Sequence, residues 1–231
     1  MKIEELIYRI QNLYSRGNPS DDSRLSNRLI YNKLIGIRSL LLSQEANKKQ
    51  KISRWNFQQI SCIELIEVPA HDCPCIPPVG CKMLRSKYKL PKPLTGINGH
   101  LIESVFTIDK QIKIDEIPFT TYSYQKGNKY TGKKTNFFIH NDYLYLTTPS
   151  RIRVVSLVGL FEDPVIASSF SGYCDDKDCK DCHCKDYLQE EFPIEASKID
   201  TLIEMSVTEL LQIFGIAHKD NYNDGRELII Q

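Results

Sequence analysis

Apolar residues near the N-terminus recur at steps of three and four, the period of an amphipathic helix. Residues 3–14 carry one such stripe, formed by Ile3, Leu6, Ile7, Ile10, Leu13 and Tyr14. Gly17 is expected to end this helix in a left-handed conformation, and a second helix is predicted to start at Ser20, Asp21 or Asp22. Its stripe consists of Leu25, Leu29, Leu34, Ile37, Leu40 and Leu41, with Arg24, Arg28, Lys33 and Arg38 outside it. The pattern predicts an N-terminal helical hairpin that needs a third element to cover it.

From residue 55 to about 170 the pattern changes to short runs rich in β-branched and aromatic residues, separated by Gly, Asn or Pro. A tight turn is expected at Asn141-Asp142, which divides the longest run into two strands. Short strands with short connections predict a central antiparallel β-domain, either a sandwich or a small barrel. The expected strands are 57–68, 80–84, 101–108, 112–117, 119–124, 136–147 and 151–161.

Proline and cysteine are concentrated in the loop that follows the first of these strands. Residues 69–80 hold four prolines, and Cys73, Cys75 and Cys81 lie in or beside them. Proline fixes φ, so this loop is expected to keep one shape. Together with the basic run 85–89 behind it, the loop is typical of a recognition surface on a β-scaffold.

The C-terminal part returns to a helical pattern. Residues 197–200 and 206–209 each resemble a capping box, which predicts two short consecutive helices packed on the N-terminal hairpin. The last residues are polar up to 227–230, an apolar tip that is either frayed or a docking segment for a neighbour. The expected organisation is α+β, with parts at 1–54, 55–170, 171–192, 193–216 and 217–231.

Composition narrows the function classes. The chain has 231 residues, of which 41% are hydrophobic and 26% charged, with a formal net charge of +1. These values are ordinary for a globular protein and do not require nucleic acid or a membrane as partner. No apolar run is long enough to cross a bilayer, and the acidic, amphipathic N-terminus does not resemble a secretory signal. Eight cysteines without such a signal indicate synthesis in a reducing compartment, where thiols stay free or bind metal.

Half of those cysteines lie in one polar segment. Residues 171–192 contain Cys174, Cys179, Cys182 and Cys184 among aspartates and lysines, where no apolar core can form. Four thiolates suit Zn²⁺, which would fold a segment too polar to fold alone, and His183 is a possible substitute ligand. The spacing matches no standard zinc finger, so a disulfide formed after release and an unliganded loop remain alternatives. The group in residues 73–81 is a weaker metal candidate.

Two other features of the sequence are candidate sites. Lys48, Lys49 and Lys51 extend a helix end, which is more often a solvated terminus than a phosphate-binding patch. With Lys133 and Lys134 they support an alternative function, a zinc-stabilised protein- or nucleic-acid-binding module. No Ser/His/Asp set, nucleotide loop or HExxH motif is present, and His71 near Cys73 and Cys75 is the one possible nucleophilic pair. We therefore expect no enzymatic activity.

Several longer segments resemble structural proteins of crAss-like bacteriophages, specifically the ring or adaptor protein of the head-to-tail connector. They are SRLSNRLIYNKL (23–34), ELIEVPAHDCPCIPPVGCKMLRSKYKLPKPL (64–94), KYTGKKTNFFIHNDYLYLT (129–147) and VVSLVGLFEDP (154–164). The resemblance spans residues 3–215 and rests on extended segments rather than on a functional motif.

The resemblance implies a non-enzymatic virion component located in the neck of the phage and made in the host cytoplasm. Such proteins form a ring, typically a dodecamer, beneath the portal, and give the next tail ring its platform. The implied partners are other copies of the chain, the portal protein, further tail ring proteins and the genomic DNA that passes through the lumen without sequence recognition; no membrane is implied. The family has no catalytic residues to carry over.

Overall fold

The computed structural model describes residues 1–17, 25–69, 82–121, 129–130, 134–147, 151–170 and 186–215. The chain divides into two compact units. The first, here the helical unit, is formed by Met1–Trp55 together with Lys185–Gln231. The second, here the barrel unit, is Asn56–Cys184. The chain therefore leaves the helical unit, builds the barrel and returns.

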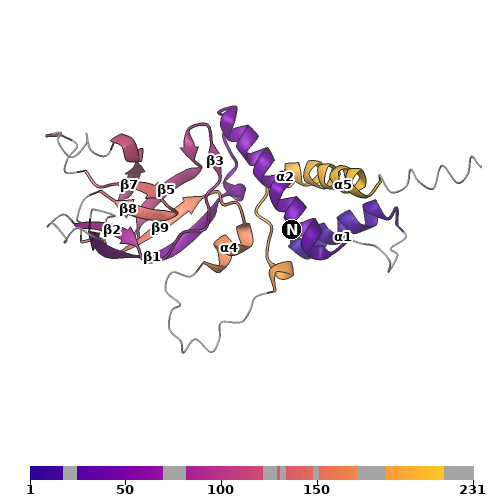
Figure 1. Ribbon diagram of the computed structural model, residues 1–231, viewed down its shortest axis with the longest axis horizontal. Helices are drawn as coiled ribbons and strands as arrows, with labels where there is room; N and C mark the ends of the chain where they lie inside the picture. The colour runs from indigo at the N-terminus through magenta and orange to yellow at the C-terminus, as the bar shows by residue number, and fades with distance from the viewer. Residues whose placement is uncertain are drawn as a thin grey trace, which may run out of the picture. The chain divides into compact units, whose positions relative to one another are not determined.

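Three long helices form the core of the helical unit: α1 (Ile3–Tyr14), α2 (Asn27–Asn47) and α5 (Ile199–Gly215) (Figure 1). Helix α5 contacts both α1 and α2, which confirms the expected third element. Ion pairs from Lys33 to Glu209 (3.0 Å) and from Lys198 to Glu45 (2.7 Å) join α2 to α5 and to the short 3₁₀ helix η4 (Ala196–Lys198) before it. Two other 3₁₀ helices are η1 (Arg54–Asn56) and η3 (Tyr187–Gln189). The fully buried side chains include Ile3, Leu6, Ile10, Ile30, Leu34, Leu42, Leu202 and Leu210.

The helix boundaries differ from the sequence prediction in two places. The second helix begins at Asn27 rather than at residues 20–22, because Ser26 is its N-cap and accepts from the Leu29 backbone N–H (3.2 Å). At the C-terminus one helix replaces the two expected. Ser206 is no cap there: its buried hydroxyl donates to the Leu202 carbonyl one turn earlier (2.7 Å), as in a helix interior. The loop between α1 and α2 includes residues 18–24, outside the described residues, so the hairpin itself stays a prediction.

The sequence pattern puts Arg38 outside the apolar stripe of the second helix, and the structure contradicts this. Its side chain is fully buried. The Nε atom donates to the Pro193 carbonyl (2.9 Å), and the guanidinium carbon lies 5.9 Å from the centre of the Phe192 ring. This buried cation therefore joins α2 to the chain segment that leads into α5.

The barrel unit contains a closed barrel of seven strands in the order β1-β2-β8-β7-β6-β5-β9 (Figure 1). This excludes the sandwich and confirms the alternative of a small barrel. The strands are β1 (Gln58–Pro69), β2 (Lys82–Ser86), β5 (Ile102–Thr107), β6 (Lys113–Glu116), β7 (Asn136–His140), β8 (Tyr143–Leu146) and β9 (Val154–Gly159). Its core cluster includes Ile60, Leu65, Leu84, Val105, Ile114, Phe137, Leu144, Leu146, Val155 and Leu157.

One neighbouring pair in the barrel, β6 and β7, is parallel, whereas the sequence predicted an antiparallel domain. The reason is geometric. Strands around a closed ring can alternate in direction throughout only if their number is even, and this ring has seven. All other neighbouring pairs in the barrel are antiparallel. The odd count therefore requires a parallel pair.

Three local elements were predicted incorrectly or missed. The expected strand at 119–124 begins instead as a 3₁₀ helix, η2 (Phe119–Thr121). Helix α4 (Pro164–Ser169) was missed, although Asp163 caps it and Pro164 occupies its first turn. The third is a small hairpin, β3 (Thr95–Gly96) with β4 (Gly99–His100).

The predicted turn between β7 and β8 is confirmed. Asn141 and Asp142 have φ of 51° and 65°, so both central residues adopt the left-handed conformation of a type I′ turn. The backbone twist of this turn matches that of the strands it joins. The register pairs Phe138 with Tyr145, whose rings stack at 5.1 Å.

Strand β1 changes partner along its length. Gln58–Glu64 pairs with β9, and Leu65–Pro69 pairs with β2. A bulge lies between Ile60 and Ile63, and within it Cys62 has φ of 60°, a strained value for a side chain with a Cβ. The buried Ser156 hydroxyl donates to the Ile60 carbonyl (3.3 Å) and so satisfies the backbone beside the bulge. The extra residue bends β1 within its pairing with β9, before the strand continues to β2.

Replacing Cys62 by glycine is expected to raise the stability of the barrel by about 0.5–1 kcal/mol. The left-handed conformation costs a residue with a Cβ roughly 1–2 kcal/mol, and glycine avoids this cost. Glycine also has more conformational freedom in the unfolded chain, which offsets part of the gain in stability. Thermal unfolding of Cys62→Gly should show a raised midpoint. Cys62→Ala is the matched control, since it keeps the Cβ; equal midpoints for the two variants would contradict strain at this position.

Candidate docking site

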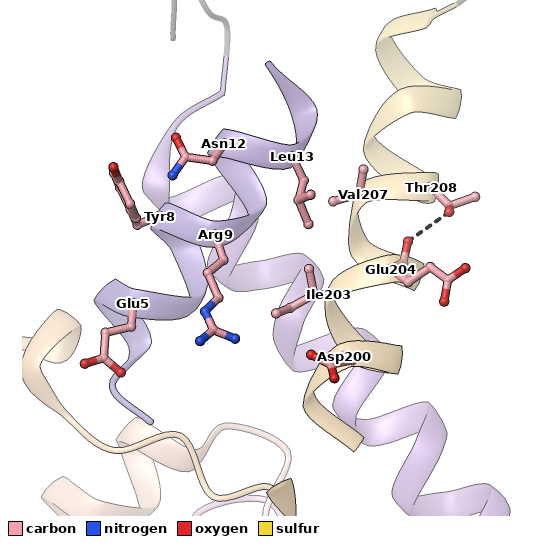
Figure 2. Close-up of a pocket in the computed structure, with 10 residues that line it drawn as sticks. All are labelled: Glu5, Tyr8, Arg9, Asn12, Leu13, Asp200, Ile203, Glu204, Val207 and Thr208. Carbon is pink, nitrogen blue, oxygen red and sulfur yellow. Dashed lines mark hydrogen bonds between the residues drawn. The ribbon is translucent and has the colours of Figure 1, made fainter. Parts of the chain in front are cut away.

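A groove with a volume of about 920 Å³ runs between α1 and α5 of the helical unit (Figure 2). The sequence pattern assigns Leu13 to the apolar stripe of α1 that packs into the core, and for Leu13 this is wrong. Leu13 is 58% exposed, and Tyr8 on the same helix is 64% exposed. Both side chains line the groove. The helix therefore has a second apolar surface beside the one that packs into the core.

Apolar side chains from both helices meet in this groove. In Figure 2, Leu13 of α1 faces Val207 and Ile203 of α5. Ile203 is buried and forms part of the floor, whereas Val207 is half-buried. Because 203 and 207 are four residues apart, they lie one above the other on the same face of α5. An apolar floor open to solvent is a feature that a partner side chain can fill.

The rim of the groove is charged and mostly acidic. Glu5, Asp200 and Glu204 contribute three carboxylates, against the single guanidinium of Arg9. Within the described part of the chain, no ion pair involves Arg9. The rim therefore favours a partner with a net positive charge and one acidic group to meet Arg9.

The walls of the groove are held by contacts beyond it. Tyr14 near the end of α1 and Phe214 near the end of α5 pack with ring centres 6.3 Å apart and nearly perpendicular planes. The Lys33–Glu209 ion pair holds α5 against α2 on another side. Within α5, the Thr208 hydroxyl donates to the Glu204 carbonyl (2.8 Å), the bond drawn in Figure 2. The groove is therefore a preformed surface between two packed helices.

The cysteines proposed as zinc ligands, Cys174, Cys179, Cys182 and Cys184, lie outside the described residues. So do His71, Cys73, Cys75, Cys81 and Lys133. Among the residues that the structure does describe, no group of three or more His, Cys, Asp or Glu side chains could hold a metal ion. No helix of the described ranges is long and apolar enough to cross a membrane.

The basic residues singled out in the sequence fall into different environments. Lys48, Lys49 and Lys51 are exposed at and beyond the end of α2. Lys134, in the barrel unit, pairs with Asp115 (2.5 Å), and the hydrogen bond from Lys134 lowers the pKa of that carboxyl group. An ion pair of this kind leaves Lys134 less available to a phosphate.

Several cations of the basic run 85–89 also interact with neighbouring side chains. Arg85 lies over the ring of Tyr143, with its guanidinium carbon 4.3 Å from the ring centre. Lys87 pairs with Glu64 (3.0 Å), and the Lys89 ammonium is 5.9 Å from the Tyr143 ring centre. These cations are bound to aromatic and acidic neighbours on the barrel, so the run contributes to barrel structure as well as to its surface.

A preformed groove with an apolar floor and a charged rim defines a protein that can work by docking to other proteins. The comparison with known families makes the class specific. The model of the family described as phage tail ring protein 2 matches residues 5–227, almost the whole chain. The chain belongs to this family and is a ring protein of a crAss-like phage, a structural component of the tail.

An individual relative agrees with this assignment. The chain is 30% identical over 217 residues to "Ring protein 2" of Bacteroides phage crAss001. The match covers 91% of this chain and 90% of the relative. It therefore includes both the helical unit and the barrel unit, and confirms the resemblance found in the sequence.

Proposed function

We propose that this protein forms one ring of the connector between the portal and the tail of a crAss-like phage. Copies of the chain associate with one another, typically as a dodecamer, and the ring stacks between the portal protein and further tail ring proteins. The protein is made in the cytoplasm of the host bacterium and is incorporated at the neck of the virion. Its contribution is structural, with no reaction assigned to it.

The observation that carries this proposal is the family match over residues 5–227. The relative from Bacteroides phage crAss001, which this chain matches over 90% of the relative's length, is also named a ring protein. A ring of identical subunits requires two different complementary surfaces on each copy, and the groove between α1 and α5 supplies a candidate for one of them.

The genome would pass through the lumen of such a ring without being recognised. A formal net charge of +1 supports this, since strong binding to the phosphate backbone depends on many lysine and arginine contacts. The ion pairs of Lys134 and Lys87 reduce the free positive charge of the barrel further. A lumen that bound DNA tightly would slow its exit.

Native mass spectrometry of the purified protein, alone and mixed with the portal protein, is expected to show a ring-sized multimer. The portal is included because a connector ring gains part of its interface from the neighbouring ring. A protein that stays monomeric in both samples at high concentration would contradict the proposal. Titration of the multimer with double-stranded DNA at low salt is expected to show weak binding that disappears as salt is added.

The same spectra test the zinc hypothesis for Cys174, Cys179, Cys182 and Cys184. Bound Zn²⁺ would add its mass to each subunit and would be removed by a chelator. Cys179→Ser should then lose the metal and be cut by proteases within residues 171–192. Equal cutting of this variant and the natural protein would contradict a metal-stabilised loop.

A further inference from the structure

The hairpin of β5 and β6 ends in a tightly held turn, Ile108–Gln111. This turn and the residue that follows it, Ile112, are together called the barrel tip. The Thr107 backbone N–H donates to the Ile112 carbonyl (3.1 Å) and the Lys110 N–H to the Thr107 carbonyl (2.8 Å). The Thr107 hydroxyl donates to the Asp109 carboxylate, which also accepts from the Gln111 N–H (3.2 Å). Lys110 has φ of 56°, so the chain reverses sharply at this residue. The barrel tip is therefore a rigid projection.

The acceptor in this turn is ionised at neutral pH. The hydrogen bond from Thr107, followed by that from the Gln111 backbone, lowers the pKa of Asp109. A carboxylate whose pKa is lowered by folding stabilises the folded turn fully at pH values above the pKa of the unfolded chain. This stabilisation is lost as the pH falls through the lower pKa of the folded state. The turn keeps its shape at the pH of a cell.

Two isoleucines are exposed on this rigid turn. Ile108 is 62% and Ile112 is 55% exposed. In the hairpin register Val105 pairs with Ile114 and Phe106 with Lys113, so Thr107 lies opposite Ile112. By the alternation of strands, Ile108 continues the face of Phe106 and Ile112 continues the face of Ile114. The barrel tip thus carries an apolar side chain on each of its two faces.

A projection that is apolar on both faces fits between two apolar walls. The groove of the helical unit has such walls: Leu13 on α1 faces Val207 on α5 (Figure 2), and Tyr8 of α1 also lines the groove. Its volume of about 920 Å³ is ample for the side chains of Ile108 and Ile112. Insertion would remove from water four of the most exposed large apolar side chains of the described residues: Tyr8, Leu13, Ile108 and Ile112.

The charges are complementary as well. Lys110 and Lys113 are exposed beside the isoleucines, and the groove rim carries Glu5, Asp200 and Glu204. Asp109, also exposed on the tip, could meet the Arg9 guanidinium in the rim. Opposite charges at a rim direct the approach of two surfaces and fix their orientation more than they add affinity.

We propose that the barrel tip of one copy inserts into the α1/α5 groove of the next copy. This inference rests on the proposed ring. The tip and the groove are different surfaces, so their contact is heterologous, and repeating it around a rotation axis closes a ring. Each copy offers one tip to one neighbour and one groove to the other.

Two variants test the contact from its two sides. The tip variant carries both Ile108→Asp and Ile112→Asp and should be unable to insert its tip. The groove variant carries Leu13→Glu and should be unable to receive a tip. Each places charge in an apolar contact and should weaken the association of copies by about thirtyfold or more, the effect of losing an interface hot spot. All three side chains are more than half exposed, so circular dichroism should show that both variants fold.

Matched controls use exposed apolar residues elsewhere. Ile97→Asp alters the tip of the β3–β4 hairpin, where the side chain is 80% exposed. Leu211→Glu alters α5 at a residue that is 48% exposed and does not line the groove. Both controls should form rings as the natural protein does.

The decisive experiment mixes the tip variant with the groove variant in native mass spectrometry. The tip variant has an intact groove and the groove variant an intact tip, so one contact forms between them and no further copy can add. A two-subunit species containing one of each, where neither variant alone forms rings, is the expected result.

Other outcomes overturn the contact. Rings formed by either variant alone, or loss of rings without the mixed pair, would show that tip and groove do not bind each other. If the controls lose their rings too, the effect is not specific to these surfaces. If the natural protein forms no ring even with the portal protein, the proposed function is wrong. If both variants form rings, the proposed function stands and only the proposed contact between tip and groove is refuted.

Discussion

Replacing Arg38 by alanine is expected to lower the free energy of unfolding of the helical unit by about 3 kcal/mol. Two losses add up to this value. The long buried side chain leaves a cavity among α2 and the residues around Phe192, and the Pro193 carbonyl loses the donor that lies 2.9 Å away. A buried acceptor left without a donor costs about 1–3 kcal/mol, and this part-buried bond is expected to lie at the lower end of that range.

Arg38→Met separates these losses, because methionine keeps much of the apolar stem but cannot donate to the Pro193 carbonyl. It should be less destabilising than Arg38→Ala. Arg28→Ala, an exposed arginine on the same helix, is the control and should change the stability by less than about 0.5 kcal/mol. Hydrogen exchange of peptides from α2 and α5 in increasing urea measures the helical unit separately. Equal stability of the alanine and methionine variants would show that packing matters little here.

Replacing Phe137 by alanine is expected to destabilise the barrel by about 4 kcal/mol. Phe137 is 2% exposed and lies in the core cluster on β7, the strand with the parallel neighbour. Its backbone is held on both sides: it pairs with Leu146 of β8, and its carbonyl accepts from Ile117 (2.9 Å). Because these strands cannot easily move inward, the space left by the ring should stay largely empty.

Phe106→Ala is the control for this variant. Phe106 is half-buried on β5 and does not belong to the core cluster, so its loss should cost less than half as much. Hydrogen exchange of peptides from β1, β8 and β9 measures the stability of the barrel. If Phe137→Ala and Phe106→Ala have the same effect, the barrel repacks around the deletion, and the core is less tightly constrained than its burial indicates.

Local patterns predicted those parts of the fold in which one residue period dominates. The stripe of α1 and the β-branched-rich apolar runs of β1, β5 and β9 placed these elements within about three residues of their observed ends. The turn at Asn141-Asp142 was found for the same reason, since two residues tolerant of the left-handed conformation separate two apolar runs. Ser206 shows the limit: a capping residue in sequence is an interior residue when its helix continues through it.

The remaining features depend on contacts distant in sequence. Closure of the barrel requires β1 to meet both β2 and β9, and no local pattern states which strands are neighbours. Arg38 looks like any arginine on a helix surface until Phe192 and Pro193 are brought beside it. The groove was missed because Leu13 fits the period of the core stripe, and its exposure depends on where α5 crosses α1. The resemblance to phage ring proteins gave the class but not these surfaces.

Closure of the barrel has a consequence for the proposed assembly of many copies. An open sheet ends in strands whose free N–H and C=O groups can pair with the same strand of a neighbour, and crowding promotes such pairing. In the ring β1-β2-β8-β7-β6-β5-β9 each described strand has a hydrogen-bonded neighbour on each side over part of its length, so less edge is left to be extended than in an open sheet. In the proposed ring, neighbouring copies would then recognise one another mainly through side chains, and the runaway strand addition that produces fibres would be less favourable.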